Sequence, residues 1–161
     1  MATPKPDIRL LLDMVDQAYD RRAWHGTNLK GSVRGLEPAQ AAWRPDPQRH
    51  NIWEIVVHAA YWKYAVRRRI LGEKRGSFPM KGSNWFHLPR EMSEAAWKAD
   101  RDMLDECHRT MRDAIANIEV RQLHRRQGRT KFTYAQLIYG IASHDLYHAG
   151  QIQLLKKLQS P

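Results

Sequence analysis

Residues 133–158 read TYAQLIYGIASHDLYHAGQIQLLKKL, and this stretch carries the clearest helical pattern of the chain. Thr133 followed by Gln136 has the spacing of a capping box, in which two side chains satisfy backbone N–H groups at the start of a helix. Beyond it, apolar and imidazole side chains recur at alternating three- and four-residue spacing, which predicts a helix with one face toward a core. That face reads Tyr134, Leu137, Ile141, His144, His148, Gln151 and Leu155.

Three further segments show the same periodicity of apolar residues. They cover residues 8–24, 52–71 and 94–118. Long connections, polar and rich in glycine and proline, join the four segments, and no strand pattern or repeat competes with them. We therefore predict one all-α domain over residues 1–161, a four-helix bundle. Its long connections leave crossover topologies open.

Capping residues predict where these helices begin and end. Asn51 and Glu54 have capping-box spacing, and Ser93 is a candidate N-cap for the third helix. Asp7, which follows a proline, is the candidate N-cap of the first. Gly72 stands where a left-handed glycine would end the second helix.

Composition excludes several classes of function. The 161 residues include one cysteine, so a disulfide within the chain and cysteine-rich zinc or iron–sulfur sites are excluded. No apolar run approaches the ~18 residues of a membrane span. Residues 1–7 lack the apolar segment of a secretory signal. We expect a cytoplasmic protein with no membrane partner.

Histidines supply the first functional signal. His144 and His148 lie four residues apart and therefore on one helix face. That face points toward the predicted core, where two imidazoles without partners are costly to bury and a divalent metal ion would satisfy both. His58 lies near the apolar face of the predicted helix 52–71. These three residues predict a metal site with open positions for water or substrate, and two hydrogen-bonded or surface histidines are the alternative interpretation.

The run HDLYH at residues 144–148 is also similar to the HExxH motif of zinc proteases, with Asp145 in place of the glutamate. No Asp, Glu or Cys follows Asp145, and no His except His148, so the third protease ligand is missing. Three roles remain open for Asp145: a hydrogen-bond partner of a metal ligand, a salt-bridge residue, or a solvated side chain. His87, in an aromatic connection, is a further candidate near the metal, and Cys107 is expected to be a buried structural thiol.

The residues around these histidines resemble the DinB/YfiT-like family. Residues 50–62, HNIWEIVVHAAYW, are similar to its second helix, and residues 43–45, WRP, to the loop before that helix. Residues 142–152, ASHDLYHAGQI, are similar to its last helix. The resemblance covers essentially the whole chain. The family is that of the DNA-damage-inducible DinB proteins, which are unrelated to the polymerase that shares the name.

The resemblance implies a bundle of up-down-down-up topology and often a homodimer. It also implies a divalent metal ion, nickel or zinc, held by His58, His144 and His148. Some relatives use small thiols such as mycothiol or bacillithiol in transferase or isomerase chemistry. We therefore expect a metal-dependent enzyme of the thiol-dependent transferase or hydrolase type, acting on an unidentified small-molecule substrate. The sequence indicates no catalytic acid or base.

The net charge of +10 is the second functional signal. Basic residues gather in two stretches, but no nucleic-acid motif or interleaved aromatic residue accompanies them. An anionic small substrate steered to the metal is favoured. The alternatives are a basic nucleic-acid- or anion-binding module with a structural or vestigial metal site, and an inactive bundle that oligomerises through its aromatic residues. The stretches contain Lys63, Arg67, Arg68, Arg69, Lys74, Arg75 and Lys81, and Arg121, Arg125, Arg126, Arg129 and Lys131.

Overall fold

The computed structural model describes residues 5–88, 91–126, 128 and 130–159. Within these residues the chain forms six α-helices and one 3-10 helix and no named strand, so the all-α prediction is confirmed. No helix among them is long and apolar enough to cross a membrane. The elements are α1 (Pro6–Tyr19), α2 (Leu29–Ser32), α3 (Pro38–Ala42), α4 (Ile52–Leu71), α5 (Glu94–Ala116), η1 (Val120–Gln122) and α6 (Tyr134–Gln159).

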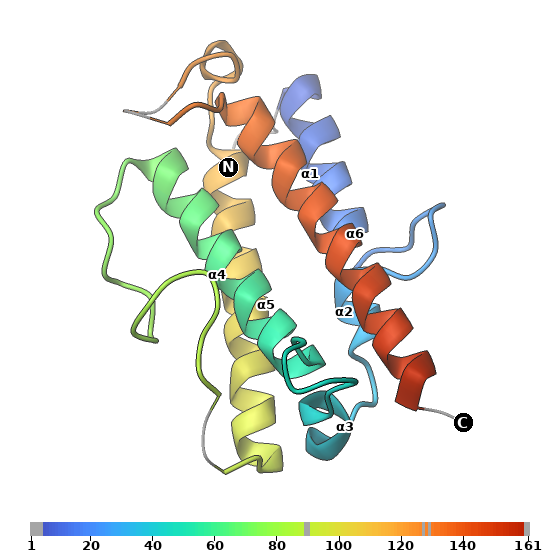
Figure 1. Cartoon of the computed structure of the whole chain (residues 1–161). Coiled ribbons are helices and arrows are strands. Elements are labelled where there is room, and N and C mark those ends of the chain that lie inside the picture. Colours follow the sequence, from blue (N-terminus) through green and yellow to red (C-terminus); the bar gives the residue numbers. More distant parts are fainter. Residues whose placement is uncertain (1–4, 89–90, 127, 129, 160–161) are drawn as a thin grey trace.

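The four long helices form the body of the molecule (Figure 1). Helix α4 packs against α5 and α6, and α1 packs against α6 and α5. The short helices α2 and α3 lie in the first long connection and contact α6 and α4 respectively. The sequence pattern did not distinguish them from loop, because four or five residues are too few to show a helical period.

Local capping chemistry explains the ends of the two helices that later position the candidate site. The Asn51 side chain accepts the Glu54 N–H at 2.8 Å, and the Glu54 carboxylate accepts the Asn51 N–H at 3.3 Å. Gly72 ends α4 with φ +72°. At the start of α6, the Thr133 hydroxyl accepts the Gln136 N–H at 3.2 Å, and the Gln136 amide oxygen accepts the Thr133 N–H at 2.8 Å. These boundaries agree with the prediction.

The first helix departs from the prediction at both ends. Lys5 is its N-cap and Pro6 its first residue, because the fixed φ of proline suits that position. The prediction that Asp7 caps the helix is wrong, and Asp7 lies in the first turn, where its charge favours the helix dipole. The helix ends at Tyr19 because the residues after it bring nothing large to the core, and the Trp24 side chain is fully exposed.

Apolar side chains fill two neighbouring clusters. One surrounds Trp53 of α4 and Trp97 of α5, whose ring centroids are 5.0 Å apart. The other joins Ile8 of α1, Met111 of α5 and Ile138 of α6. On α4, α5 and α6, buried polar residues lie along the helix between members of the two clusters. Lys63, His108 and Asp145 are three of them.

Lys63 and Asp145 form an ion pair that joins α4 to α6 in the core, with side-chain exposures of 0% and 1%. The ammonium group also lies 4.6 Å from the centroid of the Tyr19 ring. Burial raises the pKa of Asp145 to about 6, while the ammonium group of Lys63 opposes the shift. Lys63 therefore does not belong to the basic surface where its sequence position had placed it.

His108 of α5 is a further polar residue buried between the two apolar clusters. Its ring stacks on Tyr19 at 3.8 Å between centroids, and its Nε2 lies 4.0 Å from the Asp16 carboxylate. Burial, with the nearby cations Lys63 and Arg112, lowers the pKa of His108 to about 2. The imidazole is therefore neutral in the folded protein.

We expect Lys63→Met to cost about 3–5 kcal/mol of unfolding free energy, because it leaves the Asp145 carboxylate buried without a counter-ion. The double variant Lys63→Met/Asp145→Leu should recover most of that loss. Urea unfolding at neutral pH measures both. The exposed pair Lys98–Asp102 is the control, and Lys98→Met should cost less than about 1 kcal/mol. Equal losses of unfolding free energy for Lys63→Met and Lys98→Met would contradict a stabilising role for the buried ion pair.

A second prediction concerns pH. The unfolded His108 side chain takes up a proton below about pH 6.5, whereas the folded one does not, so this residue lowers stability as the pH falls. His108→Phe keeps the ring contact with Tyr19 but removes the titration. Between about pH 6 and pH 4 its unfolding free energy should fall less steeply than that of the unchanged protein, by up to about 1.4 kcal/mol per pH unit. Parallel curves from urea unfolding would refute this.

Candidate metal centre

His58 of α4 and His144 and His148 of α6 bring their imidazole rings together in the space between these two helices. His144 Nε2 lies 3.1 Å from His58 Nε2 and 3.1 Å from His148 Nε2. One potential ligand atom from each residue lies within 4.8 Å of the others. His58 and His148 are buried and His144 is half-buried. The structure thus brings together the three histidines that the sequence singled out, and the group could hold a metal ion.

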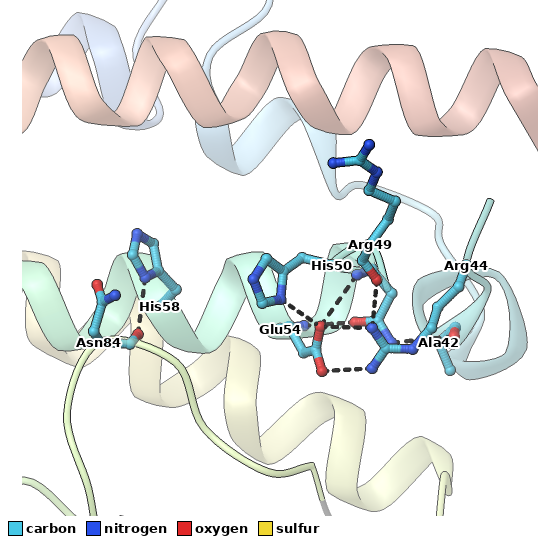
Figure 2. Close-up of polar contacts among 8 residues, drawn as sticks. Ala42, Arg44, Arg49, His50, Glu54, His58 and Asn84 are labelled. Atoms are coloured by element: carbon cyan, nitrogen blue, oxygen red, sulfur yellow. Dashed lines mark hydrogen bonds and ion pairs between the residues drawn. The ribbon is translucent and has the colours of Figure 1, made fainter. Parts of the chain in front are cut away.

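Hydrogen bonds on the far side of two rings fix which nitrogen carries the proton. His58 Nδ1 lies 2.8 Å from the backbone carbonyl of Asn84, as Figure 2 shows, and a carbonyl only accepts. His148 Nδ1 lies 2.7 Å from the amide oxygen of Gln151. The Gln151 amide nitrogen donates to the Tyr147 hydroxyl at 3.1 Å, which keeps the oxygen toward His148. In the neutral rings of His58 and His148, Nε2 therefore carries a lone pair.

His144 is unable to satisfy both neighbours. A neutral imidazole has a single N–H, so His144 Nε2 donates to at most one of its two neighbours at 3.1 Å, and to neither when the proton is on Nδ1. Its buried Nδ1 has no hydrogen-bond partner among the described residues. A cation at the common focus would satisfy all three Nε2 atoms. Imidazole nitrogens on one tetrahedral ion lie about 3.3 Å apart, close to the two separations of 3.1 Å that involve His144.

The electrostatic surroundings keep these rings in the form that binds metals. Burial lowers the pKa of His58 to about 4. Burial, with His148 and His58 nearby, lowers the pKa of His144 to about 3. Burial also lowers the pKa of His148. All three are neutral at pH 7, so a metal ion would not have to displace protons from them.

The connection between α4 and α5 covers His58. The Trp85 ring stacks on His58 at 3.9 Å between centroids and also stacks on His50 at 3.5 Å. His50 Nδ1 is in turn 2.9 Å from the Glu54 carboxylate. The Glu54 carboxylate also accepts a hydrogen bond from the guanidinium group of Arg44, in the WRP segment (Figure 2). The donor and acceptor atoms are 2.9 Å apart. The start of α4 and the covering connection are thus tied to one another beside the histidines.

Asn84 is the turning point of that connection. Its backbone has φ +68°, in the left-handed region that asparagine tolerates better than most residues. Its side-chain oxygen accepts the Trp62 indole N–H at 3.0 Å while its carbonyl accepts from His58. Asn84 therefore orients a candidate ligand and anchors the covering loop at once.

Two cavities adjoin the histidines. One, of about 310 Å³, has His144 and Trp62 in its wall. The other, of about 410 Å³, has His148 and Trp85 in its wall. Each is within the size range of small-molecule sites. The histidine group is therefore reachable from two sides.

A model of one protein family matches residues 21–152, and its description is the DinB superfamily. The chain belongs to the DinB superfamily. The matched range of this DinB protein includes all three histidines and the covering connection. No curated protein and no solved structure matched the chain.

Other predicted candidates lie apart from this DinB histidine group. His87 is exposed and is not in the group, and the neighbouring Trp85 covers His58 in its place. Asp145, of the three roles left open for it, takes that of a salt-bridge residue. Cys107 is half-buried, and burial raises the pKa of its thiol to about 11, which suits a structural residue. The carbonyl of Asn84 was missed, because a backbone acceptor leaves no signal in the sequence.

The conformation of Asn84 generates a prediction. Asn84→Gly keeps the left-handed backbone and loses only the bond to Trp62, whereas Asn84→Ala adds backbone strain. We expect Asn84→Ala to be less stable than Asn84→Gly by about 1 kcal/mol in urea unfolding. An alanine variant as stable as the glycine variant would show that the left-handed turn is not needed.

Proposed function

We propose that this DinB superfamily protein is a metal-dependent enzyme whose divalent ion is bound by His58, His144 and His148. The supporting observation is that His144 Nε2 lies 3.1 Å from the Nε2 atoms of both His58 and His148, which carry lone pairs, within one group of three potential ligands. Membership of a superfamily of metal-binding proteins supports it further. Nickel and zinc are the proposed metals, since both suit imidazole ligands.

Three protein ligands leave coordination positions open, as catalytic metal sites require. When bound, such an ion lowers the pKa of a water or thiol ligand and so supplies a nucleophile near neutral pH. The protein itself orients the rings through Asn84 and Gln151 and excludes water from one face of His58 with Trp85. Asp145 does not serve as a general base in this proposal, because it is buried against Lys63.

A thiol-dependent transferase is the reaction class that we favour over a hydrolase. A transferase needs room for two reactants, and the two cavities reach the histidine group at His144 and at His148. A low-molecular-weight thiol is the proposed co-substrate. We also propose the up-down-down-up topology and the homodimer that the family resemblance implies. Exposed apolar residues that share the outer face of α6 support the homodimer; they are Tyr147, Leu154 and Leu158.

A nucleic-acid-binding module is the weaker alternative. Three cations of the predicted basic stretches are paired within the protein: Lys63 with Asp145, Arg67 with Glu73, and Arg121 with Glu119. Arg129 of the second stretch lies outside the described residues.

Metal titration tests the proposal. The protein is purified without an affinity tag or added metal, its metal content is measured by mass spectrometry, and Ni²⁺ and Zn²⁺ are titrated into the stripped protein by calorimetry. We expect a single tight site. His148→Ala should abolish it, and Gln151→Leu should weaken it about 10–100-fold, because His148 loses the partner that orients it.

The matched control is His25→Ala, which removes an exposed histidine far from the group in sequence. It should bind both metals as tightly as the unchanged protein. Equal affinities for the His148→Ala and His25→Ala variants, or no binding by the unchanged protein, would overturn the proposed metal centre.

A further inference from the structure

The cavity beside His144 adjoins a second cavity of different character. The first is lined mainly by apolar and aromatic side chains, among them Trp62, Leu137 and Phe132. The second, of about 550 Å³, is strongly basic. Arg69 and Phe132 line both, so the two form one groove that leads from His144 to a basic end. The cations of that end are Arg68, Arg69, Arg75 and Lys131.

The basic end has more positive charge than its own acids balance. Glu73, the acid in its wall, pairs with Arg67 at 2.9 Å, and its backbone carbonyl accepts from Arg68 at 3.0 Å. Among the described residues, Arg69, Arg75 and Lys131 form no ion pair within 4 Å. Burial lowers the pKa of Arg69, and the guanidinium groups of Arg68 and Arg75 lower it further. An anion placed there would relieve that repulsion.

Arg69 also connects the two parts of the groove. Its guanidinium carbon lies 5.8 Å from the centroid of the Trp62 ring, which lines the apolar part beside His144. Phe132, which lines both parts, is 54% exposed and offers an apolar surface at their junction. A ligand that lies along the groove therefore meets apolar side chains at one end and unpaired cations at the other.

We propose that this groove is the substrate site of the histidine centre and binds an amphiphilic organic anion. The apolar body of the ligand occupies the cavity beside His144, and its phosphate or carboxylate group contacts Arg69, Arg75 and Lys131. The inference rests on the proposed function for the role of substrate, and on the groove itself for binding.

Other occupants fit less well. A nucleic-acid strand needs cations spaced along its backbone, whereas these four gather around one cavity. A second copy of the chain, docked by a twofold axis through this face, would bring the cluster against itself. A small molecule with one acidic group matches both the single cluster and the adjoining cavity of about 310 Å³.

Gly140 gives a sharp test. It lines the apolar cavity, and a Cβ added to it meets nothing within 4 Å, so Gly140→Leu places a side chain in the groove without a clash at Cβ. Gly150 lies on the same helix with equally open surroundings and does not line the groove. Gly150→Leu is therefore the matched control. For the basic end, Arg69→Gln is compared with Arg34→Gln, which removes an exposed arginine elsewhere.

The experiment titrates octyl phosphate, octanol and inorganic phosphate into metal-free protein by calorimetry. We expect octyl phosphate to bind more tightly than either fragment. Arg69→Gln should lower the affinity for octyl phosphate at least tenfold and leave the affinity for octanol unchanged. Gly140→Leu should lower the affinity for both octyl compounds. Gly150→Leu and Arg34→Gln should behave as the unchanged protein. Octanoate in place of octyl phosphate distinguishes a carboxylate site from a phosphate site, and binding of either supports the proposal.

Failure of this inference is distinguishable from failure of the metal centre. Normal metal binding with no binding of octyl phosphate or octanoate would overturn the groove proposal alone. So would equal affinities in the Gly140→Leu and Gly150→Leu variants, or displacement of octyl phosphate by a single-stranded oligonucleotide at physiological salt. The unchanged protein could also bind octyl phosphate in a way that depends on Arg69 and Gly140, yet bind no metal. That result would support the groove as an anion site and overturn the proposed metal-dependent enzyme.

Discussion

The buried ion pair between Lys63 and Asp145 is the constraint on which the candidate site depends. The two buried charges must meet, because a buried charge that loses its partner is costly. Lys63 lies on the same helix as His58, and Asp145 is adjacent to His144. We infer that the pair fixes the rotation of α4 against α6, and that this rotation makes the three Nε2 atoms converge.

The histidine group adds a second constraint, which acts through protons. Asn84 and Gln151 accept the N–H groups of His58 and His148 and so turn two lone pairs inward. The third ring then has too few protons for both neighbours. Three neutral imidazoles, two of them buried with lone pairs turned inward, are costly to hold together unless a cation is present. The energetic argument for a metal ion therefore follows from the surroundings of the rings as much as from their number.

The long helices and the histidine trio could be predicted from the sequence because their signals are local. Capping pairs such as Asn51 and Glu54, and a four-residue spacing on one helix face, depend on neighbouring residues alone. The role of Lys63 could not be predicted, because its partner lies on a helix distant in the sequence. The role of the Asn84 carbonyl as the acceptor from His58 could not be predicted either, because every residue has a backbone carbonyl. The net charge indicated a basic surface. Only the folded structure shows that Lys63 is buried whereas other cations of the same stretch line a cavity.

Anomalous diffraction from crystals of the metal-loaded protein tests the central claim most directly. The account predicts one strong anomalous peak between α4 and α6, about 2.0–2.1 Å from the Nε2 atoms of His58, His144 and His148. A peak bound by other residues, or these three rings joined only by hydrogen bonds in crystals grown with excess metal, would contradict it.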